Sequence, residues 1–389
     1  MQAPAIASLL RREMDNIIHG RDNNGLVIFV KGEPGIGKSD VVKQVAQSIA
    51  KDMKLSFHEV GQPAPEDESG KSITSDKLFG FGDLRAPLLD VTDLRGIPYV
   101  LNGMAIWGVP MFLPKSNRDG EFGILFCDEL SAAPPPVQTN FYQLFLNKRI
   151  GEYNFPKRWM IVAAGNRDTD RAVTYRMSTA LTSRIITVTF DVSYEAWREW
   201  ALLHSIHPFV LAYHEWQKGK KLHVFDPVST KTDVNFPCPR TWEFVSKILY
   251  GGFDEAFKGA TKSTGEHNQV MGELIAGAVG TGASVEFHGF LRLMDKLPNL
   301  VKIRDGTFNE NSVPKETNIQ YAMVAALSSM IEEKDEVEQI NNLFRFSYLL
   351  QPELAVLMCR LIRVGHQKAL SRSKEFFTFM DKYQKLVAP

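Results

Sequence analysis

Eight consecutive residues near the start of the chain have the types and spacing that bind a phosphate group. They are Gly32, Glu33, Pro34, Gly35, Ile36, Gly37, Lys38 and Ser39, in the pattern G-x-x-x-x-G-K-[ST]. Glycine lets backbone N–H groups curl around a phosphate without a Cβ clash. We expect the Lys38 ammonium to reach the β- and γ-phosphates of ATP, and the Ser39 hydroxyl to bind Mg²⁺.

The residues on both sides of this loop favour that interpretation. Residues 26–30 are a continuous apolar run, typical of a buried parallel strand, and apolar residues recur at helical spacing after Ser39. The loop, taken as far as Asp40, is therefore predicted to bind the nucleotide at a helix N-terminus, where the helix dipole favours anions. A Gly/Pro turn with an exposed lysine is the alternative, and it requires neither flank.

A pair of carboxylates follows a second apolar run. Residues 123–127 lead into Asp128 and Glu129, as a buried strand would deliver acids to the carboxyl edge of an open α/β sheet. We expect Asp128 to hold Mg²⁺, usually through water, beside Ser39. Glu129 is expected to orient and deprotonate the attacking water. A strand that ends in solvated acids is the alternative, and Cys127 is expected to be a packing residue.

Two more polar residues lie next to apolar runs later in the chain. Asn166 follows residues 159–164 and a glycine, so it is predicted at a strand tip, bridging the attacking water and the γ-phosphate. An Asn after a Gly is otherwise a common turn residue. Arg184 precedes residues 185–190, predicted as an edge strand. It is either a surface charge or a residue that reaches the nucleotide of a neighbouring subunit.

Composition limits the class of protein. The chain has 389 residues, enough for two or three domains, and its 45 basic and 45 acidic residues give a formal charge of 45 − 45 = 0. This balance argues against a nucleic-acid surface covering the whole protein but leaves room for a local basic channel. Few, distant cysteines, arginines at Arg11 and Arg12, and no long apolar stretch indicate a soluble, cytoplasmic protein without membrane insertion.

Periodicity separates an α/β half from a helical half. A helix is predicted over residues 4–19, a strand over 55–60, a polar loop over 61–77, and mostly helices from 239 onward. Residues 78–120 are rich in glycine and aromatic residues and are predicted to be loops that project apolar groups.

Most of the aromatic residues in that stretch are expected to pack in the core. Some of Phe79, Phe81, Trp107 and Phe112 are the candidates to face a pore or a partner instead. Near the C-terminus, residues 356–387 carry a local charge of 7 − 2 = +5. A solvated helix face is the first interpretation, and an acidic partner or nucleic acid is the alternative.

The order of these elements resembles an AAA+ ATPase: phosphate loop, acidic strand end, Asn166, Arg184, and then Arg240 at the start of a later helix. Within residues 5–250, details resemble the MoxR branch. They are the DELSAAPP run from Asp128, the RIGEY turn from Arg149, and the Pro239-Arg240-Thr241-Trp242 run.

The resemblance implies an α/β fold with an AAA+ P-loop NTPase core, its parallel sheet sandwiched by helices, then an all-α lid and a C-terminal helical region. The implied divisions are an N-terminal helix (1–20), the α/β nucleotide-binding domain (21–212), a linker (213–238), the helical lid (239–302) and the C-terminal helical region (303–389).

The same resemblance implies roles for single residues. Lys38 and Ser39 belong to Walker A, Asp128 and Glu129 to Walker B, and Asn166 is sensor 1. Arg240 becomes sensor 2, contacting the γ-phosphate from the lid, and Arg184 becomes the arginine finger, with Arg171 and Arg176 as alternatives. A finger supplied in trans implies a homo-oligomeric ring, most often of six, with active sites at the interfaces.

The implied function is Mg²⁺-dependent ATP hydrolysis that remodels or activates a protein client in the manner of a chaperone. The MoxR resemblance adds a von Willebrand factor A domain protein as partner. A nucleic-acid-translocating motor is one alternative, which zero net charge disfavours. A nucleotide-gated scaffold ring is another, which the presence of both Asp128 and Glu129 disfavours.

Overall fold

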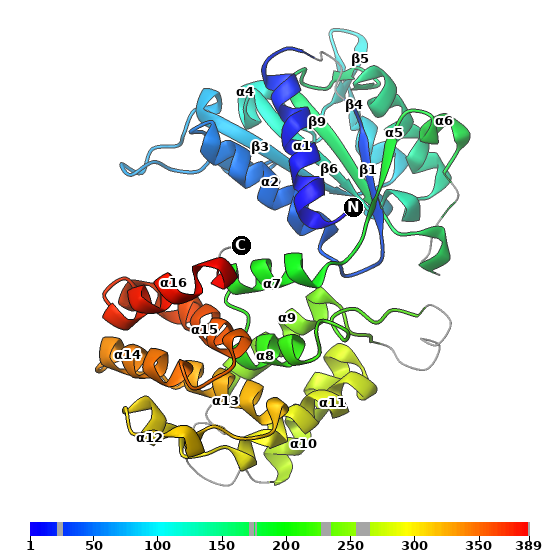
Figure 1. The fold of residues 1–389 in the computed structure, drawn as a ribbon. Helices are drawn as coiled ribbons and strands as arrows, with labels where there is room; N and C mark the ends of the chain where they lie inside the picture. Colours follow the sequence, from blue (N-terminus) through cyan, green and yellow to red (C-terminus); the bar gives the residue numbers. More distant parts are fainter. Residues whose placement is uncertain (22–25, 171–174, 176, 227–234, 254–264, 388–389) are drawn as a thin grey trace. The chain divides into compact units, whose positions relative to one another are not determined.

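The computed structural model describes residues 1–21, 26–170, 175, 177–226, 235–253 and 265–387. They form two compact units, Met1–Ser193 and Tyr194–Pro389. The first is an α/β unit and the second is helical (Figure 1). The predicted fold class, an α/β phosphate-loop core followed by a helical region, is therefore confirmed.

A six-stranded sheet organises the first unit. Its strands are β1 (Ile28–Gly32), β2 (Ser56–Glu59), β3 (Leu78–Arg85), β6 (Phe122–Asp128), β9 (Trp159–Gly165) and β10 (Ile186–Phe190). They lie in the order β10-β1-β9-β6-β3-β2, and every pairing is parallel. Because the strands are parallel, their carboxyl ends meet at one edge, where ligands bind in sheets of this kind.

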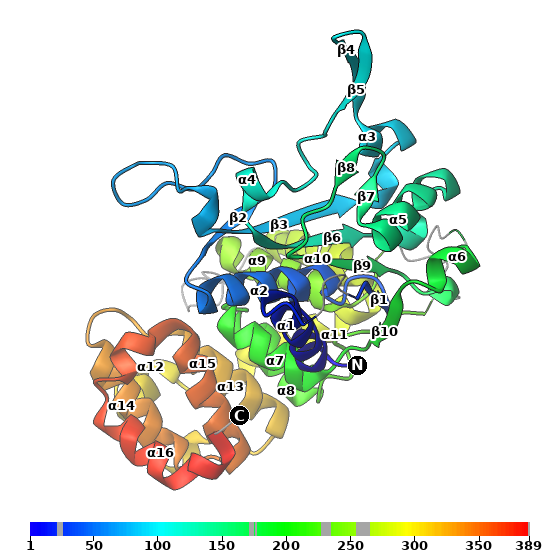
Figure 2. The same ribbon diagram turned by 90° about the horizontal axis from the view of Figure 1, so that it is seen from above.

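Helices cover both faces of this sheet (Figures 1 and 2). They are α1 (Ala3–Ile18), α2 (Lys38–Asp52), α3 (Val91–Arg95), α4 (Ser116–Asp119), α5 (Pro135–Asn147) and α6 (Thr179–Thr182). Along β1, Ile28 and Val30 pack in the cluster that holds α1 and α2, whereas Phe29 packs in the cluster that holds α5. Burial on both faces explains why these strands are continuous apolar runs.

The stretch 78–85 is a strand, which corrects the prediction of a loop there. β3 lies between β2 and β6, and its Gly80 gives the space that the Trp159 ring occupies. A Cβ at Gly80 would lie 2.2 Å from Trp159 Cη2, so this glycine marks a close approach rather than a turn. Phe79 and Phe81 are core residues, with 0% and 3% exposure.

Residues 97–108 form a hairpin that projects away from the sheet (Figure 2). β4 (Ile97–Leu101) and β5 (Met104–Gly108) are joined by Asn102 and Gly103, whose φ angles are 52° and 76°. Two central residues with positive φ define a type I′ turn, and the Asn-Gly pair was a signal for it that our sequence analysis missed. Both strands present apolar side chains to solvent, and Ile97 is 80% exposed.

The other two aromatic candidates of this region are partly buried. The Arg95 guanidinium lies 4.2 Å from the centre of the Trp107 ring, a cation–π contact. Phe112 packs against the core cluster beneath α5.

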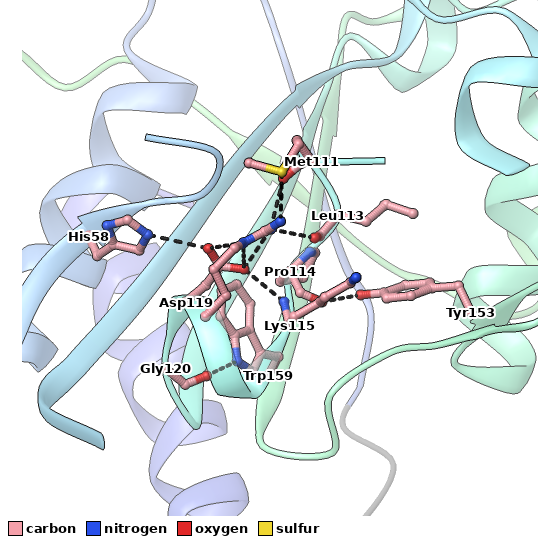
Figure 3. Close-up of polar contacts among 10 residues, drawn as sticks. His58, Met111, Leu113, Pro114, Lys115, Asp119, Gly120, Tyr153 and Trp159 are labelled. Atoms are coloured by element: carbon pink, nitrogen blue, oxygen red, sulfur yellow. Dashed lines mark hydrogen bonds and ion pairs between the residues drawn. The ribbon is translucent and has the colours of Figure 1, made fainter. Parts of the chain in front are cut away.

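The return from the hairpin to β6 is fixed by a buried ion cluster (Figure 3). Asp119 is fully buried and accepts hydrogen bonds from Arg118 Nε at 2.9 Å and Nη2 at 2.7 Å. Its carboxylate also lies 3.3 Å from His58 Nε2 on β2. Arg118 Nη2 donates to the carbonyls of Met111 and Leu113, both at 2.8 Å. The cluster therefore ties residues 111–119, which lead into β6, to β2.

Helices build the second unit. They are α7 (Tyr194–Leu203), α8 (Pro208–Trp216), α9 (Pro239–Ile248), α10 (Gly265–Val279), α11 (Thr281–Leu291), α12 (Leu300–Arg304), α13 (Thr317–Ser329), α14 (Glu336–Ser347), α15 (Pro352–Leu370) and α16 (Lys374–Val387). Tyr213 of α8 packs on Trp242 and Phe287, with ring centroids 5.4 and 5.1 Å away. The compact units thus divide after Ser193, and α7 and α8 belong to the helical unit, whereas the implied α/β domain extended to residue 212.

Basic residues of 356–387 make contacts within this unit. Arg360 lies 3.9 Å from Glu215, and Lys382 Nζ lies 4.7 Å from the centre of the Tyr348 ring. These contacts give two of the cations a structural role. Separately, no helix in the described part of the chain is long and apolar enough to cross a membrane.

The second unit should lose stability in acid because of His214. The imidazole is fully buried between Trp197 and Trp242, and among the described residues neither ring nitrogen has a hydrogen-bond partner. Burial lowers the pKa of His214 from 6.5 to about 3. Between these two pH values His214 is protonated in the unfolded chain and neutral in the native state. The free energy of unfolding therefore falls as pH drops from 6.5 towards 3. The loss at pH 5 is about 2 kcal/mol.

Urea unfolding followed by tryptophan fluorescence at pH 7 and pH 5 tests this. His214→Phe should flatten the pH dependence, and His204→Gln, at an exposed histidine, should keep it. If the free energy of unfolding of His214→Phe depended on pH as strongly as that of the wild type, His214 would not be the cause.

Candidate functional site

The loop between β1 and α2 has the backbone of an anion cradle. Gly35 and Gly37 have φ angles of 73° and 88°, which favour glycine. No side chain caps the first turn of α2, so its N–H groups are suited to an anion. A Cβ at Gly32 would lie 2.8 Å from Ile36 Cδ1 and 2.9 Å from the Phe190 carbonyl. The first glycine of the motif is therefore required by packing.

The remaining loop side chains have different surroundings. Ile36 is a core residue, Glu33 and Pro34 are half-buried, and Asp40 is exposed in the first turn of α2. An acid in a first turn, such as Asp40, is stabilised by the helix dipole.

Lys38 connects the loop to the end of β9. Its Nζ donates to the carbonyls of Gly32 at 2.9 Å and Glu33 at 2.8 Å, and to Asn166 Oδ1 at 3.0 Å. The ammonium therefore lies within the loop, already in contact with the strand-tip amide that the sequence placed near the γ-phosphate.

Ser39 meets the acidic strand. Its Oγ donates to Asp128 Oδ2 at 2.7 Å, although the two residues are 89 positions apart. Asp128 is the last residue of β6 and is half-buried. A hydroxyl and a carboxylate placed together offer the hard oxygen ligands that Mg²⁺ prefers.

Glu129 leaves the strand through a strained backbone. Its φ is 54°, in the left-handed region, and its N–H donates to Asp128 Oδ1 at 2.9 Å. A non-glycine residue in this region costs free energy, and such strain is concentrated at functional sites. The Glu129 side chain is exposed, so its carboxylate is accessible to water beside Asp128.

Asn166 is held by a close backbone approach. Its N–H donates to Ser131 Oγ at 3.2 Å, and a Cβ on the preceding Gly165 would lie 2.6 Å from the same oxygen. Gly165 is thus needed for the strand end to approach Ser131. The sequence does not mark Ser131 as part of the site, because nothing in its spacing from Asn166 indicates the contact.

Arg167 is the second residue that the sequence analysis missed. Its Nη1 donates to Glu33 Oε1 at 2.9 Å and its Nη2 to Asp191 Oδ1 at 3.0 Å. The guanidinium therefore bridges the phosphate loop and the residue that follows β10. Adjacency to Asn166 was the only signal in the sequence.

Asp83 is a third carboxylate at this edge, near the end of β3. Loss of water around it, and then the nearby charge of Asp128, raise the pKa of Asp83, which Arg85 opposes. Strand pairing brings these groups together, so no local motif marks them. Burial also raises the pKa of the neighbouring Cys127 thiol, in agreement with a packing residue.

The predicted arginines are placed less directly. Arg184 lies 4.6 Å above the Tyr142 ring and donates to Ala180 O and Ser183 Oγ at 2.5 and 2.8 Å. These partners lie on or beside α5 and α6, not on the phosphate loop. Arg240 is exposed at the start of α9 in the second unit. Arg171 and Arg176 lie outside the described residues.

The residues that the structure brings together suit a magnesium–nucleotide complex. The uncapped start of α2 and the Lys38 ammonium suit phosphate, and Ser39 with Asp128 suits Mg²⁺. In the described ranges, no group of three or more His, Cys, Asp or Glu could hold a metal by itself. Magnesium sites of this kind are completed by water and substrate phosphates.

Comparisons with known proteins give low similarities. No family model matches the chain, and no curated protein matches it. A solved structure from Cytophaga hutchinsonii, described as a candidate ATPase, has 18% identity and a TM-score of 0.32, with 51% of this chain and 50% of that chain covered. The chain therefore spans half the length of that protein.

Two structures from Thermotoga maritima are similar over more of the chain. A RuvB point mutant has 14% identity and a TM-score of 0.34, covering 85% of this chain and 82% of that one. A DNA polymerase III gamma subunit-related protein has 13% identity and a TM-score of 0.36, covering 98% of both. The strand order and the loop geometry described above identify the α/β phosphate-loop core.

Proposed function

We propose that this protein is a Mg²⁺-dependent ATPase of the AAA+ class. The observation that carries the proposal is the meeting of three strand ends at one point, where Lys38 contacts Asn166 at 3.0 Å and Ser39 contacts Asp128 at 2.7 Å. A phosphate loop, a carboxylate and a polar strand tip in contact are the parts that phosphoryl transfer to water requires, because that reaction depends on positioning and charge stabilisation.

Each residue of the site has one role in this reaction. The loop N–H groups and Lys38 bind the phosphates, and Asn166 orients the attacking water. The water oxygen bonds to the γ-phosphorus while the bond to the β–γ bridging oxygen breaks, which releases ADP and phosphate. Glu129 accepts the proton of the water. Ser39 and Asp128 would hold Mg²⁺, which would supply positive charge against the phosphate oxygens.

The proposal includes an active site shared between copies of the chain. Arg184, or Arg171 or Arg176 in its place, is the finger that a neighbouring subunit supplies, and Arg240 is sensor 2. The proposed assembly is a homo-oligomeric ring, and six is the expected number of subunits. The further division of the helical unit into a lid (239–302) and a C-terminal region (303–389) belongs to the same proposal.

A protein client of the MoxR type fits the exposed hairpin. Residues 97–108 contain no charged residue, and Ile97 and Val100 are 80% and 75% exposed. An exposed apolar surface of this kind marks contacts with other proteins, whereas nucleic acid requires cations. The client, a von Willebrand factor A domain partner and a cytoplasmic location complete the proposal.

Nucleotide binding and turnover should separate in two variants. Lys38→Ala should lose ATP binding, because the phosphates lose their cation. Glu129→Gln should keep Mg²⁺–ATP affinity and lower kcat by a factor of about 10² to 10⁴, because it removes only the base. Isothermal titration and phosphate release measure the two quantities. Turnover that survives Lys38→Ala would refute the ATPase; a cellular function that survives Glu129→Gln would favour the nucleotide-gated scaffold.

Mixing two inactive variants tests whether the finger acts in trans. Glu129→Gln subunits keep Arg184, and Arg184→Ala subunits keep Glu129. Each variant alone should hydrolyse ATP slowly. Loss of the finger should lower kcat by a factor of about 10³ or more. Mixed rings should recover activity, since some interfaces then combine an intact base with an intact finger. Absence of recovery, with mixed assembly verified by crosslinking, would contradict a trans role for Arg184.

The client class can be tested with the hairpin. Glu129→Gln rings isolated from native cells should retain a protein client, and added Ile97→Ser and Val100→Ser changes should release it. Leu203→Ser, at a residue that is 82% exposed in the second unit, is the matched control and should retain it. Recovery of nucleic acid, released by salt, would instead favour the translocating motor.

A further inference from the structure

Two consecutive residues after β9 hold two different residues of the phosphate loop. Asn166 Oδ1 accepts a hydrogen bond from Lys38 Nζ at 3.0 Å, and Arg167 Nη1 donates to Glu33 Oε1 at 2.9 Å. Glu33 follows the first glycine of the loop, and Lys38 follows its last glycine. The strand tip is therefore fastened to the loop at two points.

The backbone around Arg167 leaves it little freedom. Its N–H donates to Asp170 Oδ2 at 2.9 Å, and the N–H of Asn166 donates to Ser131 Oγ at 3.2 Å. With both amides held, the direction in which each side chain leaves the strand is fixed. A guanidinium has a rigid fork of donors, so it transmits position better than an ammonium would.

Arg167 makes two ion pairs, one with Glu33 and one with Asp191, which we call its Glu33 arm and its Asp191 arm. The two arms are not equivalent. The side chains of Arg167 and Glu33 are 29% and 26% exposed, whereas Asp191 is 55% exposed. Water and salt weaken an exposed pair more than a half-buried one. The Glu33 arm is also the one that touches the phosphate loop, so any effect on the nucleotide should pass through it.

We infer that Arg167 is a positioning residue for ATP hydrolysis, which fixes Asn166 against the phosphate loop through its pair with Glu33. The inference rests on the proposed ATPase function and deepens it. Arg167 acts through Asn166 and does not itself contact the phosphates. Its effect therefore belongs to the transition state, where the water must be aligned, and not to the binding of the nucleotide.

A positioning role for Arg167 predicts a change in kcat without a comparable change in KM. A displacement of about 1 Å in a group that orients a reactant costs up to about 10²-fold in rate. Loss of the Glu33 arm should thus lower kcat by about tenfold or more, with KM for ATP changed by less than about threefold. A phosphate-binding arginine would instead raise KM, and a plain surface ion pair would change neither quantity.

The experiment uses the full chain and four variants: Glu33→Gln, Arg167→Gln, the Glu33→Gln/Arg167→Gln double variant, and Asp191→Asn. The last is the control for the other ion pair of the same guanidinium, of nearly equal length. It also removes the pair between Asp191 and the Met1 ammonium, and it leaves the loop untouched. ATPase rates give kcat and KM. Hydrogen exchange of residues 164–168 in the nucleotide-free protein gives a readout independent of turnover.

We expect lower kcat and faster exchange at Asn166 in both single variants, with no further loss in the double variant and wild-type behaviour in Asp191→Asn. Arg167→Lys should rescue part of kcat, because it keeps the charge toward Glu33. The inference is overturned by an unchanged kcat and exchange in Glu33→Gln, by a raised KM, or by equal effects of Asp191→Asn. A wild-type protein that bound no ATP would refute the ATPase, while the exchange data would still decide whether the Glu33 pair fixes Asn166.

Discussion

The parallel pairing of β1, β9 and β6 is the constraint on which the site depends. Lys31 lies opposite Gly165, and Cys127 lies opposite Ala163, so the chains that continue from these strands leave the sheet at the same edge. A slip of one residue would turn every side chain of a strand to the other face. Because each strand packs on helices on both sides, the apolar core fixes the register, and the register places the polar residues.

At this edge the polar groups are paired with one another. Ser39 donates to Asp128, and Lys38 donates to Asn166 and to loop carbonyls. Under the proposed function, a nucleotide would exchange these hydrogen bonds for others, and each such exchange would contribute only about 1–3 kcal/mol. Affinity should come mainly from the charge of the phosphates against Lys38 and the α2 N-terminus, while the existing contacts keep the groups oriented for reaction.

The spacing of residues along the sequence predicted those elements that depend on neighbouring residues alone. The loop, the apolar runs of β1, β6 and β9, and the helix after the loop follow from spacing alone. β3 was predicted as a loop partly because of its glycines. Gly80 leaves space for the ring of Trp159, a residue far along the chain, and a sequence does not distinguish a glycine at a close approach from one in a turn. Arg167 and Asp83 were missed for a related reason, since each acquires its surroundings from another strand.

The surroundings of Arg184 show why a residue that is proposed to act on a neighbouring copy is difficult to place from one chain. Its guanidinium lies on the Tyr142 ring, and its Nη1 has acceptors in α6. Among the described residues, however, its buried Nε has no hydrogen-bond partner. A buried donor without an acceptor costs about 1–3 kcal/mol. In the proposed ring, a phosphate oxygen of an adjoining subunit would accept from this donor and remove that cost.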